Sequence, residues 1–271
     1  MGIARFSAIV LTVLVLLASG AYASGFENSG IGMKARGMSG AYRAIADDWS
    51  AAYYNPAGYA WIWDNQLGSA WAFVHHRDEI VPDARWGGVY ERGFFNDRVN
   101  YNHHEVLSNP SGGILLRLPV AGETVFGLSA YQRFDQNITW RLFQPVRSYS
   151  DSVVIPGDQF GANLDVVSFQ LSAAREVVPE KMSIGIGLQV MRADLAYSNI
   201  FFRENPITNS PGDPMWDIMQ DFPYDRIPQW NKNVGRGWGL GFNAGIITKG
   251  NDKLRAGFSF NYPFPITISG T

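Results

Sequence analysis

The chain has 271 residues, with 22 Lys and Arg against 24 Asp and Glu, so its formal net charge is −2. This near balance excludes the strongly basic surface of a nucleic-acid-binding protein. A cysteine count of 0 excludes disulfide scaffolds, thiolate metal sites and cysteine catalysis. Hydrophobic residues make up 46% and charged residues only 17%, with 14% aromatic residues and 29 glycines. That composition favours β structure over a helical bundle.

The first segment has the features of a secretory signal peptide. Arg5 precedes a mostly apolar run over residues 6–18, and Ala21 and Ala23 are the small residues of a cleavage site. The run is shorter than the about 20 residues that a transmembrane helix needs. We therefore predict a signal peptide over 1–23, cleaved after Ala23. Because no second long apolar run follows, any membrane must be crossed by β-strands.

Apolar residues alternate with small or polar residues along most of the remaining chain. For example, Leu240 and Phe242 alternate with Gly241 and Asn243. The longer windows reach the about 9 residues of a tilted transmembrane strand, and several have aromatic residues near their ends. A soluble β-sandwich shows the same alternation, so this pattern alone leaves both classes open. The predicted strands are residues 67–77, 112–119, 124–135, 161–176, 182–197, 237–248 and 254–269.

The connections between these strands are alternately long and short. The long ones are 78–111, 136–160 and 198–236, and the short ones are 120–123, 177–181 and 249–253. Long loops on one side and tight turns on the other are typical of outer-membrane barrels, and a sandwich has no reason to alternate in this way. The fold class we predict is all-β, a transmembrane antiparallel β-barrel.

Residues 24–66 lack strand alternation and are rich in Gly and Ala. The sequence Asn55-Pro56-Ala57-Gly58 has turn chemistry. A segment of this length and composition fits inside a barrel lumen as a plug. The alternative is a flexible leader.

Five motifs of this segment, in order, resemble the N-terminal hatch of the FadL/TodX family of outer-membrane transport proteins. They are Ser24-Gly25-Phe26, Gly30-Ile31-Gly32, 37–42, 44–48 and Tyr54-Asn55-Pro56-Ala57-Gly58. Residues 126–128, 181–188, 239–245 and 255–259 resemble the third, fifth, sixth and seventh strands of that family.

The resemblance implies a passive channel in the Gram-negative outer membrane for long-chain fatty acids or other hydrophobic compounds. The expected partners are a hydrophobic small molecule, outer-membrane lipid and the barrel-assembly machinery, with no cofactor and no nucleic acid. A porin-like pore for polar solutes and a structural or adhesive surface barrel are the alternatives.

The family builds a fourteen-stranded barrel, whereas seven strands are predicted here. Since bacterial barrels have an even number of strands and no open edge in lipid, residues 67–271 are expected to be the first half of a barrel. The alternative is a small barrel with one more strand, for which 86–90 is the best candidate.

Two groups of residues are candidates for ligand binding. Asp213 and Pro214 suit the start of a helix, after which apolar residues follow at helical spacing. This stripe, with Trp216 beside it, predicts either a landing site for a hydrophobic substrate or a packing face on the barrel rim. The resemblance adds the N-terminal residues, which lie beside the ligand in the family; a frayed terminus is the alternative. The candidates are Met215, Trp216, Ile218, Met219, Phe222, Ser24, Gly25 and Phe26.

The predicted hatch contributes two further sets. Asn55, Pro56 and Ala57 resemble the hatch turn that faces a kinked third strand, where substrate leaves sideways; read alone, they are simply a turn. Lys34, Arg36 and Arg43 are candidate partners for a substrate carboxylate, by charge-assisted hydrogen bonds. Pairing with Asp47 or Asp48, or exposure to water, is the alternative for these three.

Nothing in the sequence supports metal binding or catalysis. His75 and His76 point to opposite faces of a predicted strand, and His103-His104 lies in a loop without a further ligand at suitable spacing. No Gly-x-Ser-x-Gly motif is present. We therefore expect no metal site, no catalytic residue and no enzyme activity.

Overall fold

The computed structural model describes residues 30–75, 77–81, 85–86, 89–90, 100–101, 106–120, 123–140, 160–204, 226–251 and 254–270. The predicted signal peptide and three histidines lie outside these residues. So do all of the ligand-binding candidates, namely Ser24, Gly25, Phe26, Met215, Trp216, Ile218, Met219 and Phe222.

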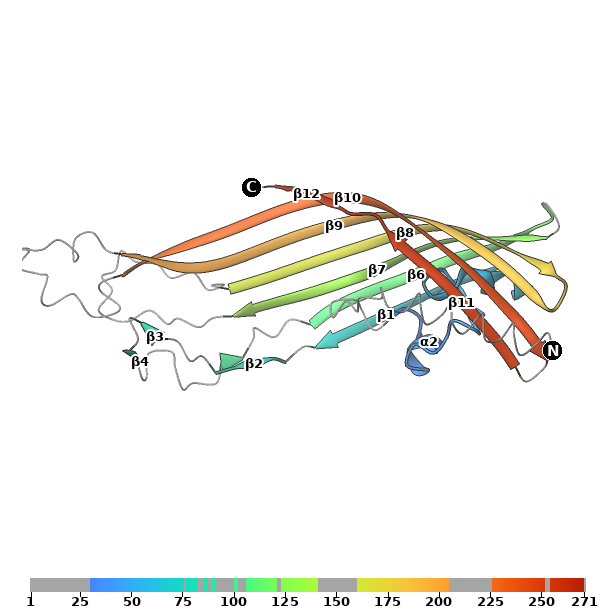
Figure 1. The fold of residues 1–271 in the computed structure, drawn as a ribbon, viewed down its shortest axis with the longest axis horizontal. Coiled ribbons are helices and arrows are strands. Elements are labelled where there is room, and N and C mark those ends of the chain that lie inside the picture. The colour runs from blue at the N-terminus through green and yellow to red at the C-terminus, as the bar shows by residue number, and fades with distance from the viewer. Residues whose placement is uncertain are drawn as a thin grey trace, which may run out of the picture.

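One antiparallel sheet dominates the described part of the chain, in the order β1-β6-β7-β8-β9-β10-β11, with β12 paired to β10 (Figure 1). Its strands are β1 (Gln66–His75), β6 (Val106–Leu118), β7 (Thr124–Trp140), β8 (Phe160–Val178), β9 (Met182–Glu204), β10 (Arg226–Asn251), β11 (Leu254–Pro263) and β12 (Thr267–Gly270). Neighbours in the main path are also consecutive among these strands, which makes the sheet a meander. Its edges β1 and β11 do not pair with each other among the described residues, so the sheet is an open barrel wall.

All seven predicted strands are present and the predicted fold class is confirmed, but several boundaries differ. Strand β6 begins before the predicted 112–119, and β9 and β10 continue beyond the predicted ends toward the long connections. The predicted strand 254–269 is divided into β11 and β12, and Pro265, which has no N–H to donate, lies in the break.

The four shortest strands form two pairs apart from the wall. They are β2 (Glu79–Ile80) with β5 (Asn100–Tyr101), and β3 (Arg85–Trp86) with β4 (Val89–Tyr90). The hypothesis that 86–90 supplies one more wall strand is therefore wrong, because among the described residues β3 and β4 pair with each other and not with the wall. No helix among the described residues is long and apolar enough to cross a membrane.

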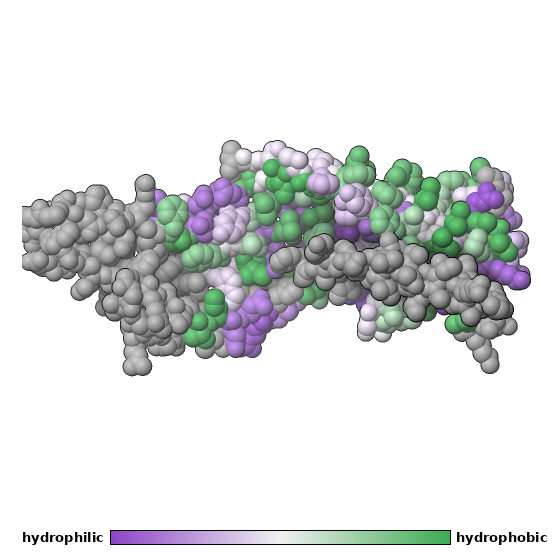
Figure 2. Space-filling view, in the orientation of Figure 1, coloured by the Kyte–Doolittle hydropathy of each residue, from purple (hydrophilic) through white to green (hydrophobic). Residues whose placement is uncertain are grey.

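The two faces of the wall differ in chemistry. On β8, Ser168, Gln170 and Ser172 are buried on the face that we call inner, whereas Phe169 and Leu171 are exposed on the outer face. Figure 2 shows many hydrophobic residues across the visible strands. Between Asp165 and Arg175 the outer face of β8 carries no charge. These positions are about 33 Å apart along the strand, which a tilt of roughly 40° reduces to the ~25 Å of an outer-membrane apolar band.

Residues 30–65, which we call the N-terminal segment, pack against the inner face of the wall. The segment contains α2 (Met33–Gly37), α3 (Ala51–Tyr54) and the 3-10 helix η1 (Pro56–Trp61). Tyr42 and Tyr59 of the segment share one buried cluster with Leu115, Tyr131 and Ile247 of the wall.

Glycines in the wall permit this close packing. A Cβ atom at Gly127 would collide with the Tyr59 ring, and one at Gly185 would collide with the backbone of Pro56 and Ala57. Gly127 and Gly185, which alternate with apolar residues in the sequence, therefore mark two places where the N-terminal segment lies against strand backbone.

Candidate functional site

A buried network of amides attaches the N-terminal segment to the wall. The carbonyl oxygen of Ala52 accepts hydrogen bonds from Gln170 Nε2 at 2.8 Å and from Asn243 Nδ2 at 2.7 Å. Gln170 Oε1 in turn accepts from the Tyr131 hydroxyl at 2.8 Å and from Gln189 Nε2 at 3.1 Å. Buried networks of this kind hold one arrangement because each missing partner is costly. We call Ala52, Gln170 and Asn243 the latch.

Asn55 fixes the predicted hatch turn. It is fully buried, and its Oδ1 accepts from the Ala57 nitrogen at 3.1 Å, which caps η1 with Pro56 in the first turn. Its Nδ2 donates to the Arg43 carbonyl at 2.9 Å and lies 3.3 Å from the carbonyls of Ile246 and Phe258.

The turn therefore lies against β10 and β11, with Pro56 and Ala57 over Gly185 of β9. The third wall strand, which the resemblance placed opposite this turn, is β7. In this structure, Tyr59 contacts β7. Its hydroxyl lies 3.3 Å from Ser129 Oγ.

The three candidate carboxylate partners have different surroundings. Lys34 Nζ donates to Asp47 at 2.7 Å and 2.5 Å, so an internal ion pair, the alternative for this residue, is present. Burial alone raises the pKa of Asp47, but hydrogen bonds from Lys34 and Tyr42 and the charge of Lys34 hold that pKa below its usual value. The backbone carbonyl of Arg43 accepts a hydrogen bond from Asn55, and Arg36 lines a cavity at the wall. Contact of any of them with a ligand stays a prediction.

The wall is parted between β6 and β7. Their pairing covers only Ser111–Leu118 with Thr124–Tyr131. Beyond this ladder β6 pairs only with β1, and β7 pairs only with β8, among the described residues. Two local causes lie at the point of separation. Pro110 has no N–H for a ladder, and a bulge at Arg133 shifts the register of β7 against β8.

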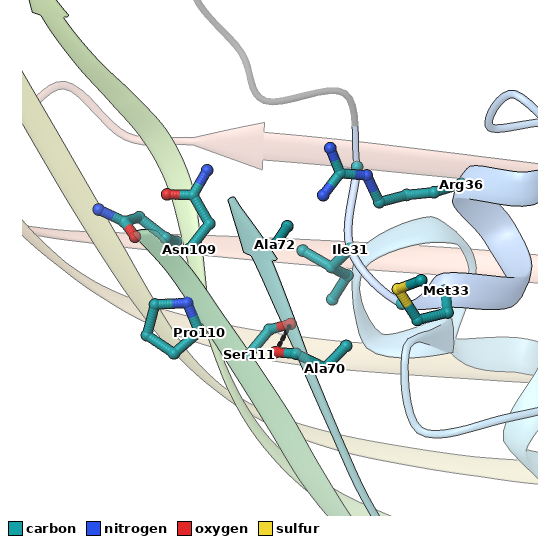
Figure 3. Close-up of a pocket in the computed structure, with 11 residues that line it drawn as sticks. Ile31, Met33, Arg36, Ala70, Ala72, Asn109, Pro110 and Ser111 are labelled. Atoms are coloured by element: carbon teal, nitrogen blue, oxygen red, sulfur yellow. Dashed lines mark hydrogen bonds between the residues drawn. The ribbon is translucent and has the colours of Figure 1, made fainter. Parts of the chain in front are cut away.

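The parting has a cavity on its inner side and a groove on its outer side. The inner cavity, of about 10 Å³, is lined by residues 30–33 and Arg36 together with β1, β6 and Gln132 of β7. Figure 3 shows Met33 and Arg36 on its α2 side and Asn109 and Pro110 on its β6 side. The outer groove, of about 280 Å³, is lined by β6, β7 and Val167. Pro110, Ser111 and Gln132 line both, and in the described part of the chain the N-terminal segment lies at the inner end of this parting.

An apolar patch lies on the inner face further toward the long connections. Its buried members are Val166, Met191 and Ala193, and its partly buried members are Phe134, Leu164, Ile266 and Ile268. The side chain of Arg133 is only 7% exposed beside this patch, with its guanidinium 5.8 Å from the centre of the Phe134 ring and Nη1 3.4 Å from Gln189 Oε1. An apolar surface with a cation at its margin suits a hydrophobic molecule with an anionic end.

The described residues contain no group of three His, Asp or Glu side chains that could hold a metal ion. His75 ends β1, whereas His76, His103 and His104 lie outside the description. The candidate site therefore consists of the latch, the parted wall and the apolar patch.

The comparisons with known proteins agree with this architecture. The chain resembles the crystal structure of a Pseudomonas aeruginosa FadL homologue with a TM-score of 0.58 and 19% sequence identity, over 89% of this chain and 56% of that one. The chain thus spans little more than half the length of that homologue. No curated protein matches the chain. The family model for outer membrane protein transport proteins (OMPP1/FadL/TodX) matches residues 14–271. The chain belongs to the OMPP1/FadL/TodX family of outer membrane transport proteins.

Proposed function

We propose that this chain is the hatch-bearing part of an outer-membrane channel for the passive uptake of hydrophobic compounds, with long-chain fatty acids as the leading cargo. The observation that carries the proposal is the parting between β6 and β7, which has an inner cavity at the N-terminal segment and an apolar groove outside. Irregular backbone at membrane depth is tolerated only where it is buried in protein or lines a cavity, which suits a route through the wall.

Cargo would first meet the outer loops, where the stripe formed by Met215, Ile218, Met219 and Phe222 is the proposed landing site. It would then occupy the apolar patch, with the N-terminal residues from Ser24 to Phe26 nearby and Arg133 facing an anionic end. Displacement of residues 30–36 would open the inner cavity toward the parting and release the cargo sideways. The support is the placement of Ile31, Met33 and Arg36 across the inner end of that opening.

No step of this route requires chemistry. The inner face supplies amides, hydroxyls and apolar side chains, which bind and release cargo without an energy source. We further propose that residues 24–66 are the hatch, that cleavage after Ala23 precedes assembly, and that additional strands pair the edges β1 and β11. Unpaired edges are not stable in hydrocarbon, since each unsatisfied backbone group there costs several kcal/mol.

Cross-linking tests the sideways route. The chain contains 0 cysteines, so introduced thiols are the only ones. Met33→Cys with Asn109→Cys places thiols on opposite sides of the inner cavity, and a short bis-maleimide joins the N-terminal segment to β6. The matched control joins Ala72→Cys to Asn109→Cys, which are register partners within the wall.

Uptake of a labelled long-chain fatty acid into cells that carry the protein is then measured. The first cross-link should abolish uptake, and the control cross-link should leave it intact. Undiminished uptake with the first cross-link would refute exit past residues 30–36. Entry of a small hydrophilic dye as fast as the fatty acid would instead indicate a pore for polar solutes.

A further inference from the structure

Among the described residues, one cation of the strands lies on the lipid-facing side of the wall near the short turns. Arg175 is exposed on the outer face of β8, where its register partner across β9 is Ile184. Within the described part of the chain, its guanidinium makes no hydrogen bond or ion pair. By contrast, Arg192 on the same face pairs with Asp194 at 3.0 Å.

A groove of about 160 Å³ runs beside Arg175 on the same face. It is lined by Thr124, Ala173, Ala174, Arg175, Ile184, Gly185 and Ile186. The hollow exists because Ala173 is small, whereas Leu171 and Ile186 around it are large and exposed. The lining is almost wholly apolar and Arg175 is its one charged residue, so the groove offers an apolar channel beside one positive charge.

The level of Arg175 in the membrane identifies what this surface meets. It stands at the end of the uncharged outer face of β8 that is nearer the tight turns, and tight turns lie on the periplasmic side of outer-membrane barrels. A guanidinium there is level with lipid phosphates, which arginine binds through paired N–H groups. An arginine that merely extended to water would need no groove beside it.

We propose that Arg175 and this groove bind one phospholipid of the periplasmic leaflet, the phosphodiester on Arg175 and an acyl chain along Ala173. The site lies on the opposite face of the wall from the cargo route and does not depend on which compound is transported.

The test measures lipid retained by the full chain after extraction from the outer membrane in a mild detergent. Native mass spectrometry counts bound phospholipid, and the delipidated protein is then titrated with a short-chain phosphatidylglycerol and with the matching phosphate-free diacylglycerol. The unaltered chain should retain one phospholipid and prefer phosphatidylglycerol about tenfold, as expected for a charge-assisted hydrogen bond.

Three variants separate this site from ordinary boundary lipid. Arg175→Gln should remove the preference for phosphatidylglycerol, and Ala173→Leu, which fills the groove but keeps the charge, should lower affinity for both lipids. Lys181→Gln removes the same charge from the adjacent turn and should change neither. Arg175→Lys, which keeps the positive charge, serves if the glutamine variant does not fold, and should retain part of the preference.

Equal retention by all folded variants, or equal losses from Arg175→Gln and Lys181→Gln, would overturn the proposal. These measurements do not involve uptake. A failed uptake test therefore leaves the lipid site standing, and a failed lipid test leaves the uptake proposal standing.

Discussion

The latch makes a quantitative prediction about how firmly the N-terminal segment is held. Gln170 and Asn243 each donate one hydrogen bond to the same Ala52 carbonyl. Either Gln170→Met or Asn243→Leu leaves that carbonyl with one donor, so each single change should lower the free energy of local opening by about 1 kcal/mol. In Gln170→Met, Tyr131 and Gln189 also lose their hydrogen bonds to Gln170. This loss occurs whether the N-terminal segment is closed or opened, so it largely cancels from the free energy of opening.

The double variant should be more than additive. With both donors gone, closing the segment buries an unsatisfied carbonyl, which costs a further ~1–3 kcal/mol. The total of about 3–5 kcal/mol corresponds to opening that is more frequent by a factor of at least roughly one hundred, against about fivefold for each single change.

Hydrogen exchange of the backbone amides of residues 51–59 in the purified protein measures this opening. Asn163→Leu, an amide on the outer face of β8, is the matched control and should leave their exchange unchanged. A double variant whose effect equals the sum of the single effects would show that the Ala52 carbonyl is not the shared acceptor in solution. Unchanged exchange in both singles would refute the latch altogether.

Three further predictions follow from the same geometry. The pKa of Asp47 is depressed in the folded chain, so its pairing with Lys34 stabilises the segment above the unfolded value of 3.8 and is lost as the pH falls through the folded pKa. Exchange followed between pH 5 and 2 should show this loss, which is less than ~1 kcal/mol for a pair this exposed. Lys34→Met should reduce it, while the hydrogen bond from Tyr42 to Asp47 remains. Gly185→Val should displace the Asn55 turn at a cost of about 1–3 kcal/mol, because the new side chain meets backbone atoms; unchanged exchange at residues 55–58 would contradict the packing. Arg133→Met should weaken binding of a long-chain carboxylate about tenfold in calorimetry but leave the matching alcohol unaffected, and equal losses for both would argue against a role in charge recognition.

The sequence allowed the wall to be predicted because its two faces differ in chemistry wherever one side meets lipid and the other meets the N-terminal segment. Beyond the apolar band this contrast fades, and there the predicted ends of β9 and β10 fell short of Glu204 and Arg226. Alternation along a strand does not identify residues whose importance comes from a single contact with a distant residue. Gln170 looks like any polar residue of a lumen, and its importance comes from Ala52, which is 118 positions away.

The bulge at Arg133 was hidden for a related reason. A register shift depends on how β7 pairs with β8, and the alternation of a single strand does not reveal it. The sequence signals were an arginine after an uncharged run from Thr124 to Gln132 and a proline at 110 in the neighbouring strand. The ion pair of Lys34 was easier to predict, because Asp47 lies close to it in the sequence and was the alternative to a substrate carboxylate.

The contacts of Asn55 also impose an order on assembly. Its amide reaches carbonyls at Ile246 and Phe258, which follow it by 191 and 203 residues. Although the N-terminal segment is synthesised before the wall, the surface on which it packs is not complete until β11 has paired with β10. Contacts this distant in sequence form slowly because a long loop must close first. Residues 30–65 are therefore made before every strand of the wall but are among the last to reach their final packing.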